Sequence, residues 1–407
     1  MNRLVVPAFA AWLVSVCFVP YWLGVNIGIG WAPATLVSVG LLAVLMPMRE
    51  LRPGLVDAVL VFVLLGYALA VAIGDTTLAG GAVLITQWGF GSLAGRAVTA
   101  RLGPSTVSLM FSLAGGLVAV LAIVEFATGT NVFVQMSAAN PLYTTWGDLQ
   151  ERGGIVRAEG AFGHSLALGG ALSIAIPFAL SAPIRQWQRL LITLALLTAV
   201  TLTFSRTAMV CAIVALLLTV LLQSGVGSPG LRVSLLAGAS VVGVAFFPLV
   251  ASVFTQAGEE ANNSAAYRGE LLPLFAEMQL VGQSPAFQRT ADGRAYFGNF
   301  RSIDSAIILT GLTYGLVPLL LLLAVLVGGI AVLVRGEATA GTVAVVAQLP
   351  ALATVAFITQ YTILFWFVAG VAVTSQQLAR AGPDRPGAQY PVASPIPVSH
   401  LTRPGTP

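Results

Sequence analysis

The sequence predicts an all-α polytopic membrane protein, on three observations. Of its 407 residues, 57% are hydrophobic and only 8% are charged, whereas a soluble domain has about 25% charged residues to cover its surface. The apolar residues form long runs, and an α-helix needs about 20 such residues to cross about 30 Å of hydrocarbon. Arginines concentrate on alternate connections between the runs, which sets an orientation in the membrane.

We expect about twelve transmembrane helices. The first six lie near residues 4–23, 30–48, 54–73, 77–95, 105–127 and 164–182, and the other six near 189–204, 207–223, 232–254, 303–334, 340–359 and 361–379. The first run resembles a signal peptide, but no small-residue cleavage site leads into a soluble domain, so we interpret it as a helix. Residues 1–380 then form one membrane domain with two long polar loops, at 128–163 and 255–302. The proline-rich segment 381–407 is expected to be a disordered tail.

The stretch Leu190–Leu222 can be read as one helix of 33 residues. At 1.5 Å per residue that helix would be about 50 Å long, well beyond the hydrocarbon thickness. It would also bury Arg206 at the middle of the bilayer, at a cost of about 2.5 to 3.5 kcal/mol. We therefore predict two short helices with Arg206 at the turn between them.

The charges predict which side each loop occupies. With the N-terminus in the cytoplasm, the inner side holds twelve of the nineteen basic residues, which are all arginine: Arg3, Arg49, Arg52, Arg96, Arg101, Arg185, Arg189, Arg232, Arg335, Arg380, Arg385 and Arg403. Only four of the fifteen acidic residues accompany them. This agrees with the positive-inside rule, so we expect both termini in the cytoplasm and both long loops outside.

Seven arginines are left on the outer side, where basic residues are normally scarce. They are Arg152, Arg157, Arg206, Arg268, Arg289, Arg294 and Arg301. An arginine held at the membrane edge is a candidate site for an anion, because its guanidinium fork matches phosphate and diphosphate oxygens. We expect an anionic ligand on this side.

Two outer stretches in the first half of the chain carry such groups. In VRAEGAFGHSLALGG, Arg157, Glu159 and His164 crowd the start of a helix; the alternative is a structural loop with arginine reaching lipid phosphates and histidine capping the helix. In TLTFSRTAMV, Arg206 lies on a very short link. The alternatives to anion binding by Arg206 are contact with lipid headgroups or a salt bridge to a distant acid such as Glu125.

Two more stretches follow in the second half. EEANNSAAYRGELLPLFAEMQLVGQSPAF is expected to form an amphipathic surface helix that begins near Asn263, carries Arg268 on its first turns, and packs through Leu271, Leu274, Phe275 and Met278. In FRSIDSAIILTGLTYG, Arg301 and Asp304 are expected on one face at the start of a helix. Asp304 is either a helix cap or a base whose ionised form Arg301 favours.

Several signatures are missing from the sequence. We find no phosphate-cradling P-loop, no His and Cys cluster of the zinc type, and no Asp-x-Asp pair to hold a divalent metal. The two cysteines lie in separate apolar runs, so no disulfide is indicated. We therefore expect no cofactor, no metal and no nucleic-acid partner.

Together these stretches resemble the O-antigen ligase and O-antigen polymerase family of bacterial envelope glycosyltransferases. The resemblance covers residues 150–330. RAEGAFGHSLA is similar to the family's Arg-x-x-Gly-x-Phe stretch, TFSRTA to its Ser-Arg turn, YRGELL to the arginine that opens its large loop, and DSAIILTGLTYG to its His-Asn segment. Asp304 and Ser305 depart from the histidine and asparagine of the ligases, which makes a polymerase the better match.

The resemblance implies a GT-C-like fold in the bacterial cytoplasmic (inner) membrane. It implies that Arg206 and Arg268 bind the diphosphate of an undecaprenyl-linked glycan, with Arg157, Glu159, His164 and Arg301 as further substrate-binding residues. Asp304 would take a proton from the acceptor hydroxyl, with Glu159 as the alternative base. The partners implied are this donor, a glycan acceptor, membrane lipids and a chain-length co-polymerase. The alternatives are an O-antigen-type ligase that transfers the glycan to another acceptor, a flippase for an anionic lipid-linked glycan, and a noncatalytic envelope scaffold.

Overall fold

The computed structural model describes residues 2–27, 29–49, 51–74, 76–223, 228–256, 258, 267, 269–289 and 295–381, and these are mostly helical. The all-α class is thus confirmed. Five described helices are long and apolar enough to cross a membrane: Leu55–Ala72, Leu78–Thr128, Pro229–Gln256, Leu316–Val334 and Tyr361–Ala381. Six shorter apolar helices accompany them: Leu4–Phe18, Pro33–Val44, Ser165–Ser181, Gln186–Leu202, Arg206–Leu222 and Ala340–Thr354.

The helices and strands follow one another along the chain with short connections in most places. The helices are α1 Asn2–Phe18, α2 Pro33–Val44, α3 Leu55–Ala72, α4 Leu78–Val83, α5 Phe90–Thr128, α6 Pro141–Trp146, α7 Ser165–Ser181, α8 Gln186–Leu202, α9 Arg206–Leu222, α10 Pro229–Gln256, α12 Ala306–Tyr314, α13 Leu316–Val334, α14 Ala340–Val346, α15 Leu349–Thr354 and α16 Tyr361–Ala381. Short 3₁₀ turns are η1 Tyr21–Leu23, η3 Gly160–Phe162 and η4 Leu272–Glu277, and η2 Leu84–Gly89 is a π-helix. Three antiparallel hairpins pair β1 Val25–Ile27 with β2 Ile29–Trp31, β3 Glu151–Arg152 with β4 Ile155–Val156, and β5 Phe287–Arg289 with β6 Ala295–Phe297.

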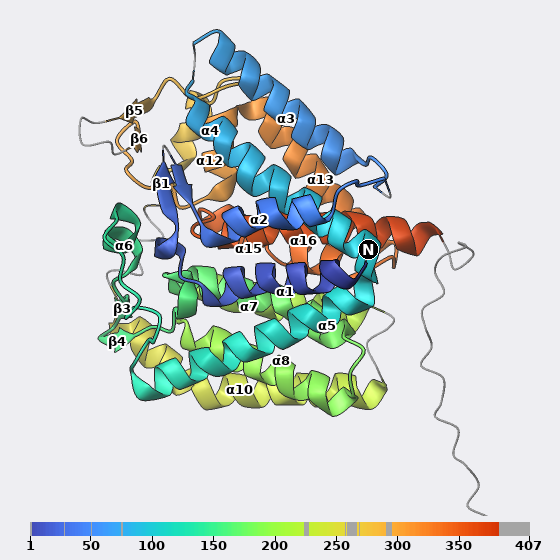
Figure 1. The fold of residues 1–407 in the computed structure, drawn as a ribbon. Helices are drawn as coiled ribbons and strands as arrows, with labels where there is room; N and C mark the ends of the chain where they lie inside the picture. The colour runs from blue at the N-terminus through green and yellow to red at the C-terminus, as the bar shows by residue number, and fades with distance from the viewer. Residues whose placement is uncertain are drawn as a thin grey trace, which may run out of the picture.

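The hairpins gather at one end of the helix bundle. In Figure 1, β1, β3, β4, β5, β6 and α6 all lie on the left, whereas the N-terminus and the end of α16 lie on the right. The described parts of the two long loops therefore share one end, which we call the loop end. At the other end Arg96 forms an ion pair with Asp57, and Arg380 pairs with Glu337 at 2.8 Å.

Helices α5 and α16 form the most extensive contact in the bundle. They approach closely because small residues face each other: a Cβ on Gly95 would lie 1.9 Å from the carbonyl oxygen of Phe367, and one on Gly370 would lie 2.0 Å from that of Ser92. Such close packing is typical of membrane helices, whose association is driven by van der Waals contact because lipid provides no hydrophobic effect between them.

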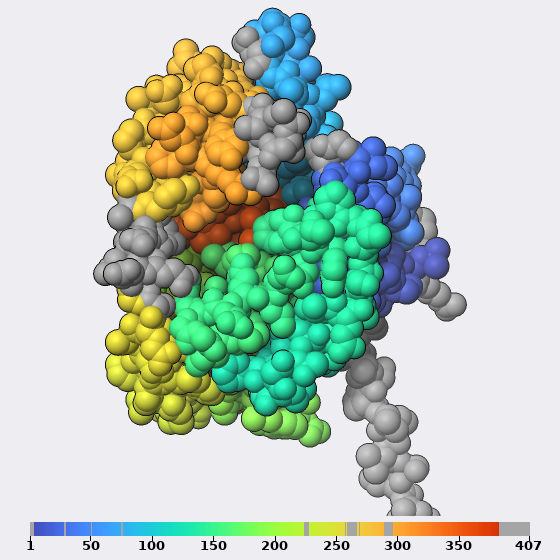
Figure 2. All heavy atoms as spheres, turned by 90° about the vertical axis from the view of Figure 1, so that its left-hand side faces the viewer, coloured from blue at the N-terminus to red at the C-terminus, as the bar shows by residue number. Residues whose placement is uncertain are grey.

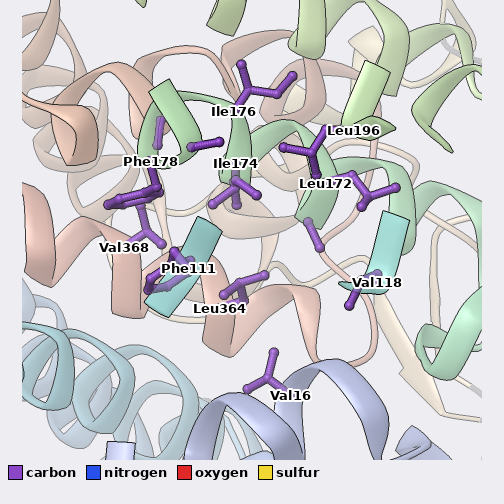
Figure 3. Close-up of a cluster of buried hydrophobic side chains, with 14 of the residues drawn as sticks. Val16, Phe111, Val118, Leu172, Ile174, Ile176, Phe178, Leu196, Leu364 and Val368 are labelled. Carbon is purple, nitrogen blue, oxygen red and sulfur yellow. The ribbon is translucent and has the colours of Figure 1, made fainter. Parts of the chain in front are cut away.

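The main core surrounds this contact. Figure 3 shows side chains of α1, α5, α7, α8 and α16 meeting there, including Phe111, Phe178 and Val368. The rings of Phe111 and Phe178 stack with centroids 4.6 Å apart. In contrast, α10 and α13 bury few side chains, and Val244 and Phe247 of α10 are 75% and 68% exposed. A helix that exposes large apolar side chains in this way is suited to face lipid.

Two predicted helices are broken in the structure. The predicted helix 303–334 begins only at Ala306 and divides at Gly315. The φ of Gly315 is 105°, a backbone angle that glycine adopts without strain. The backbone of residues 279–284 bonds there: the N–H of Leu316 donates to the carbonyl of Gln279 at 2.8 Å, and the N–H of Ser284 to that of Leu312 at 2.7 Å. The break therefore has its polar groups satisfied by an inserted loop.

The predicted helix 340–359 is divided into α14 and α15 and ends early, at Thr354. Residues 355–360 are not helical, although they lie between two helices of the bundle. We call residues 354–360 the central segment.

The predicted break between residues 204 and 207 is confirmed. Helix α8 ends at Leu202 and α9 begins at Arg206, so the link is Thr203–Ser205. The side chain of Ser205 caps α9 by accepting from the N–H of Ala208 at 3.3 Å. Arg206 is thus the first residue of a helix. It lies at the loop end of the bundle, because Arg152 of β3 donates to the carbonyl of Phe204 in the preceding link.

Candidate functional site

The central segment joins three parts of the chain that carry predicted site residues. The hydroxyl oxygens of Thr354 and Thr207 lie 3.1 Å apart, which fixes the segment to the start of α9 beside Arg206. The carbonyl of Val355 accepts from the N–H of Ala306 at 2.8 Å, which fixes it to the start of α12, two residues after Asp304.

The far end of the segment is fixed to the third part. The side-chain amide nitrogen of Gln360 donates to the carbonyl of Ala161 at 3.0 Å and to that of Val19 at 3.2 Å. Ala161 belongs to η3, which begins directly after Glu159. Arg206, Asp304 and Glu159 are therefore each within two residues of a group bonded to this one segment.

Arg206 is exposed and its guanidinium carbon lies 4.5 Å from the ring centre of Phe254. Among the described residues, no carboxylate lies within ion-pair distance of it. The alternative salt bridge to Glu125 does not form, because the Glu125 oxygens accept from other groups. The donors of the guanidinium are thus available to a ligand.

Arg157, which is predicted to bind substrate, contacts the α8–α9 link. It is buried, and its Nε donates to the carbonyl of Thr203 at 2.8 Å. Arg152 donates in the same way to the carbonyl of Phe204 at 3.0 Å. These two arginines hold the α8–α9 link in place and so position Arg206.

Glu159 is 1% exposed, and its Oε1 accepts from the backbone N–H of Gln150 at 3.1 Å. Burial raises the pKa of Glu159 to about 7, against the opposing effects of that hydrogen bond and of the Arg157 charge. A carboxyl group with this pKa exchanges protons near neutral pH.

Glu125, near the end of α5, is a residue that the sequence reasoning considered only as a salt-bridge partner. Its carboxylate accepts from the side-chain amide of Asn131 at 2.9 Å and from the N–H groups of Glu159 and Gly160 at 3.0 and 2.9 Å. It therefore anchors the loop of Glu159. A small cavity of about 300 Å³ lies beside it, lined also by Asn131 and Arg157.

His164 caps α7, since its Nδ1 accepts from the N–H of Leu166 at 3.1 Å. Burial, together with the charges of Arg157 and Arg152, lowers the pKa of His164 to about 4. The imidazole is thus neutral at pH 7. The geometry supports the structural interpretation of this residue that the sequence left open.

Arg301 and Asp304 both precede α12, so the prediction that they share a helical face is wrong. The helix cap is Ser305, whose side chain accepts from the N–H of Ile308 at 3.3 Å. Asp304 is partly exposed, and its Oδ1 accepts from the hydroxyl of Ser302 at 2.9 Å. The carboxylate is therefore free of the capping role.

Tyr267 lies next to this carboxylate. Its hydroxyl donates to the carbonyl of Ser302. Burial, followed by the charge of Asp304, raises the pKa of Tyr267. Arg268, the next residue, lies outside the described residues, as do Arg294 and the side chain of Arg289.

The described part of the expected amphipathic helix is α-helical at Tyr267, Gly269 and Glu270 and then changes to a tighter turn. Residues Leu272–Glu277 form a 3₁₀ turn, with Pro273 in its first turn. Leu271 and Leu274 are buried against α12 and Met278 is partly buried there, but Phe275 is 42% exposed. The apolar face is thus narrower than helical spacing predicted.

Both described non-glycine residues with positive φ border this site. Phe204, on the α8–α9 link, has a φ of 45°, and Thr359, in the central segment, has a φ of 50°. Such backbone costs on the order of 1–3 kcal/mol for a residue with a Cβ and tends to cluster at functional sites. Strain thus coincides here with the convergence of the three chain segments.

An apolar groove of about 870 Å³ runs along the bundle beside the central segment. Phe287 and Phe297 line it at the loop end, and Gly54 and Arg380 line it at the other end. Ala306, at the start of α12, and Phe357, of the central segment, also line the groove.

Figure 2 views the loop end. The surface is hollowed between the orange segment around α12 and the green segments between α5 and α9. The red C-terminal part of the chain forms the floor of this hollow. Within the described ranges, no three His, Cys, Asp or Glu side chains are close enough to hold a metal ion. No family model matches this chain, and neither does any curated protein.

Proposed function

We propose that the protein is a metal-independent glycosyltransferase that polymerises undecaprenyl-diphosphate-linked oligosaccharide units for surface or exopolysaccharide synthesis. The observation that carries this proposal is the attachment of the start of α9 and the start of α12 to one central segment. It places Arg206, a cation suited to diphosphate, and Asp304, a carboxylate suited to accept a proton, at the same end of the bundle.

The donor would use the groove and the arginine together. The prenyl chain is apolar, and the groove is lined mainly by apolar side chains such as Leu319 and Phe357. Its diphosphate would reach Arg206, where the first N–H groups of the 17-residue helix α9 add a favourable dipole. By the resemblance, Arg268 would supply a second guanidinium.

In the proposed reaction, a hydroxyl of the acceptor glycan attacks the anomeric carbon of the donor sugar. The new C–O bond forms as the bond from that carbon to the diphosphate oxygen breaks, and Arg206 stabilises the negative charge on the departing lipid diphosphate. Asp304 takes the hydroxyl proton, because its carboxylate is partly exposed and has one described hydrogen-bond donor, Ser302. Glu159 is the alternative base, supported by its pKa of about 7.

We further propose about twelve membrane spans in a GT-C-like arrangement, in the bacterial cytoplasmic membrane with both termini inside. Supporting this, the shorter apolar helices lie in the same bundle as the five long ones, and Leu78–Thr128 is interrupted at Gly103. Arginines paired with Asp57 and Glu337 mark the end proposed to be cytoplasmic. A chain-length co-polymerase is the proposed protein partner.

A transporter for an anionic lipid-linked glycan is the second candidate. The observation in its favour is the set of broken helices, at Gly315 and at residues 355–360, which are common where transporters bind substrate. The polar groups freed at Gly315 are bonded to the loop 279–284. Because these hydrogen bonds are already made within the protein, the break favours a rigid binding site over a helix that moves during transport.

The test uses purified protein in liposomes with a synthetic undecaprenyl-diphosphate oligosaccharide and a chelator. Polymerase activity produces a ladder of products, a ligase produces a single addition to its acceptor, and a flippase moves the lipid without forming bonds. Movement without any new glycosidic bond would overturn the proposal of a glycosyltransferase.

A further inference from the structure

Two neighbouring residues of the central segment carry buried polar atoms that have no partner in the described part of the protein. They are the hydroxyl of Thr359 and the side-chain oxygen of Gln360, on residues that are 7% and 1% exposed. Among the other unpartnered buried polar atoms of the described residues, no two lie on consecutive residues.

The orientation of the Gln360 amide follows from its surroundings. Its nitrogen faces the carbonyls of Ala161 and Val19, and carbonyls only accept hydrogen bonds. A flipped amide would place three acceptors together. The oxygen therefore points away from these carbonyls and lacks a donor, which costs about 1–3 kcal/mol when nothing binds.

Thr359, the neighbouring residue, adds backbone strain to this free-energy cost. Its φ of 50° lies in the left-handed region, where a β-branched side chain is a genuine outlier. Glycine would adopt this backbone without strain and would leave no hydroxyl to satisfy. A strained threonine beside an unpartnered amide oxygen thus lowers the stability of the fold. A ligand that donates hydrogen bonds to the two side chains would satisfy their free oxygen atoms.

The chemistry of the pair defines the ligand. A neutral amide oxygen only accepts hydrogen bonds, and a hydroxyl can both donate and accept. Together they match neighbouring hydroxyl groups, whereas an anion would require donors only. The pair lies at the far end of the central segment, where Gln360 is bonded to Ala161, two residues after Glu159. The other end of the same segment carries the attachment points of α9 and α12.

We propose that Thr359 and Gln360 form a subsite for hydroxyl groups of the acceptor glycan. This inference rests on the proposed transferase function and extends it, because it assigns acceptor binding to a part of the chain separate from the arginines. The Thr359 hydroxyl orients one sugar hydroxyl, and Gln360 accepts from the next. Arg206 then serves the donor and the central segment serves the acceptor.

Thr359→Gly and its matched control, Thr359→Ser, test this subsite. The glycine variant removes the hydroxyl and relieves the strain, so we expect a fold at least as stable as the natural one and a KM for acceptor raised about five-fold, the value of one hydrogen bond of about 1 kcal/mol. The serine variant keeps the hydroxyl and should retain the natural KM. The KM for the lipid-linked donor should be unchanged in both.

A second measurement separates this inference from the transferase proposal. Binding of a repeat-unit oligosaccharide, prepared by partial hydrolysis of the source organism's own surface polysaccharide, is measured by calorimetry for the natural protein and both variants. Binding that weakens in Thr359→Gly and persists in Thr359→Ser supports the subsite even if no transfer is seen, in which case the transferase proposal alone fails. Equal acceptor KM and equal binding in the natural protein and Thr359→Gly would overturn the subsite and indicate that the hydroxyl meets only water.

Discussion

The hydroxyl oxygens of Thr207 and Thr354 lie 3.1 Å apart and join the first turn of α9 to the last residue of α15. Arg206 directly precedes Thr207, so this contact fixes the backbone position from which the Arg206 side chain extends. Thr354 also donates to the carbonyl of Pro350 at 2.7 Å, so its own hydroxyl stays satisfied when Thr207 changes. The contact is therefore open to a clean test.

Thr207→Val removes one hydroxyl at nearly constant volume. We expect a stability loss of at most about 1 kcal/mol and a fall in kcat of about ten-fold or more, because small displacements of a charge-stabilising group are costly. Glycan transfer in liposomes measures kcat, and detergent melting curves measure stability. Thr219→Val, on the same helix but bonded only to the carbonyl of Ala215, is the control and should remain active. Full activity of Thr207→Val would show that the contact does not position Arg206.

Arg206→Ala should abolish glycan transfer while the protein remains inserted and folded. Loss of a group that stabilises a leaving diphosphate is expected to lower kcat by about 10²–10³-fold. Arg206→Lys should recover only part of this, since lysine has the charge without the planar fork. Arg335→Ala changes an exposed arginine at the other end of the bundle and is the control. Normal polymer from Arg206→Ala would contradict the assignment. Arg268→Ala is expected to behave in the same way.

Asp304→Asn tests the general base. Asparagine keeps an oxygen that can accept from the Ser302 hydroxyl, and Ser305 rather than Asp304 caps α12, so the fold should be unchanged. If Asp304 takes the proton, kcat falls by about 10²–10⁴-fold and donor KM stays constant. Glu159→Gln is the paired variant. Activity that survives Asp304→Asn and disappears in Glu159→Gln would reverse the two roles.

The sequence predicted the parts of this fold that depend on hydropathy and length. The division at Thr203–Ser205 followed from the length of the Leu190–Leu222 run and from the cost of burying Arg206, and the structure has it. The clustering of both long loops at one end followed from the number of helices between them. These features are set locally, by the need of each apolar run for a helix of limited length.

The central segment escaped prediction because tertiary contacts create it. Thr359 and Gln360 interrupt an apolar stretch that otherwise continues into α16, and their partners at Val19 and Ala161 are far away in the chain. Glu125 likewise binds groups up to 35 residues away, so its anchoring role leaves no local pattern. The cap of α12 was ambiguous because Asp304 and Ser305 are both suitable capping residues. The one local signal was the polar pair Thr359–Gln360 within an apolar run.

Glu159→Gln should make the protein more stable at neutral and alkaline pH. Burial raises the pKa of Glu159 from 4.5 to about 7, so between these values the unfolded chain releases a proton that the folded chain keeps. The contribution of Glu159 to the free energy of unfolding is therefore highest below about pH 4.5, falls as the pH rises and reaches its minimum above about pH 7. The difference of 7 − 4.5 = 2.5 pH units corresponds to at most about 3 kcal/mol. Glutamine cannot titrate, and its oxygen can still accept from the N–H of Gln150.

Melting temperatures of the purified protein between pH 4 and pH 8 measure this effect. His164 contributes in the opposite direction, because its pKa is lowered to about 4 and its stabilising effect is lost as the pH falls below 6.5. That contribution is common to the natural protein and the variant, so the difference between their curves isolates Glu159. The difference should grow from pH 4.5 to pH 7 in favour of Glu159→Gln and then level off. A difference that stays constant over this range would mean that Glu159 is already ionised in the folded protein, and the carboxylate would then have no raised pKa with which to act as a proton donor or acceptor near neutrality.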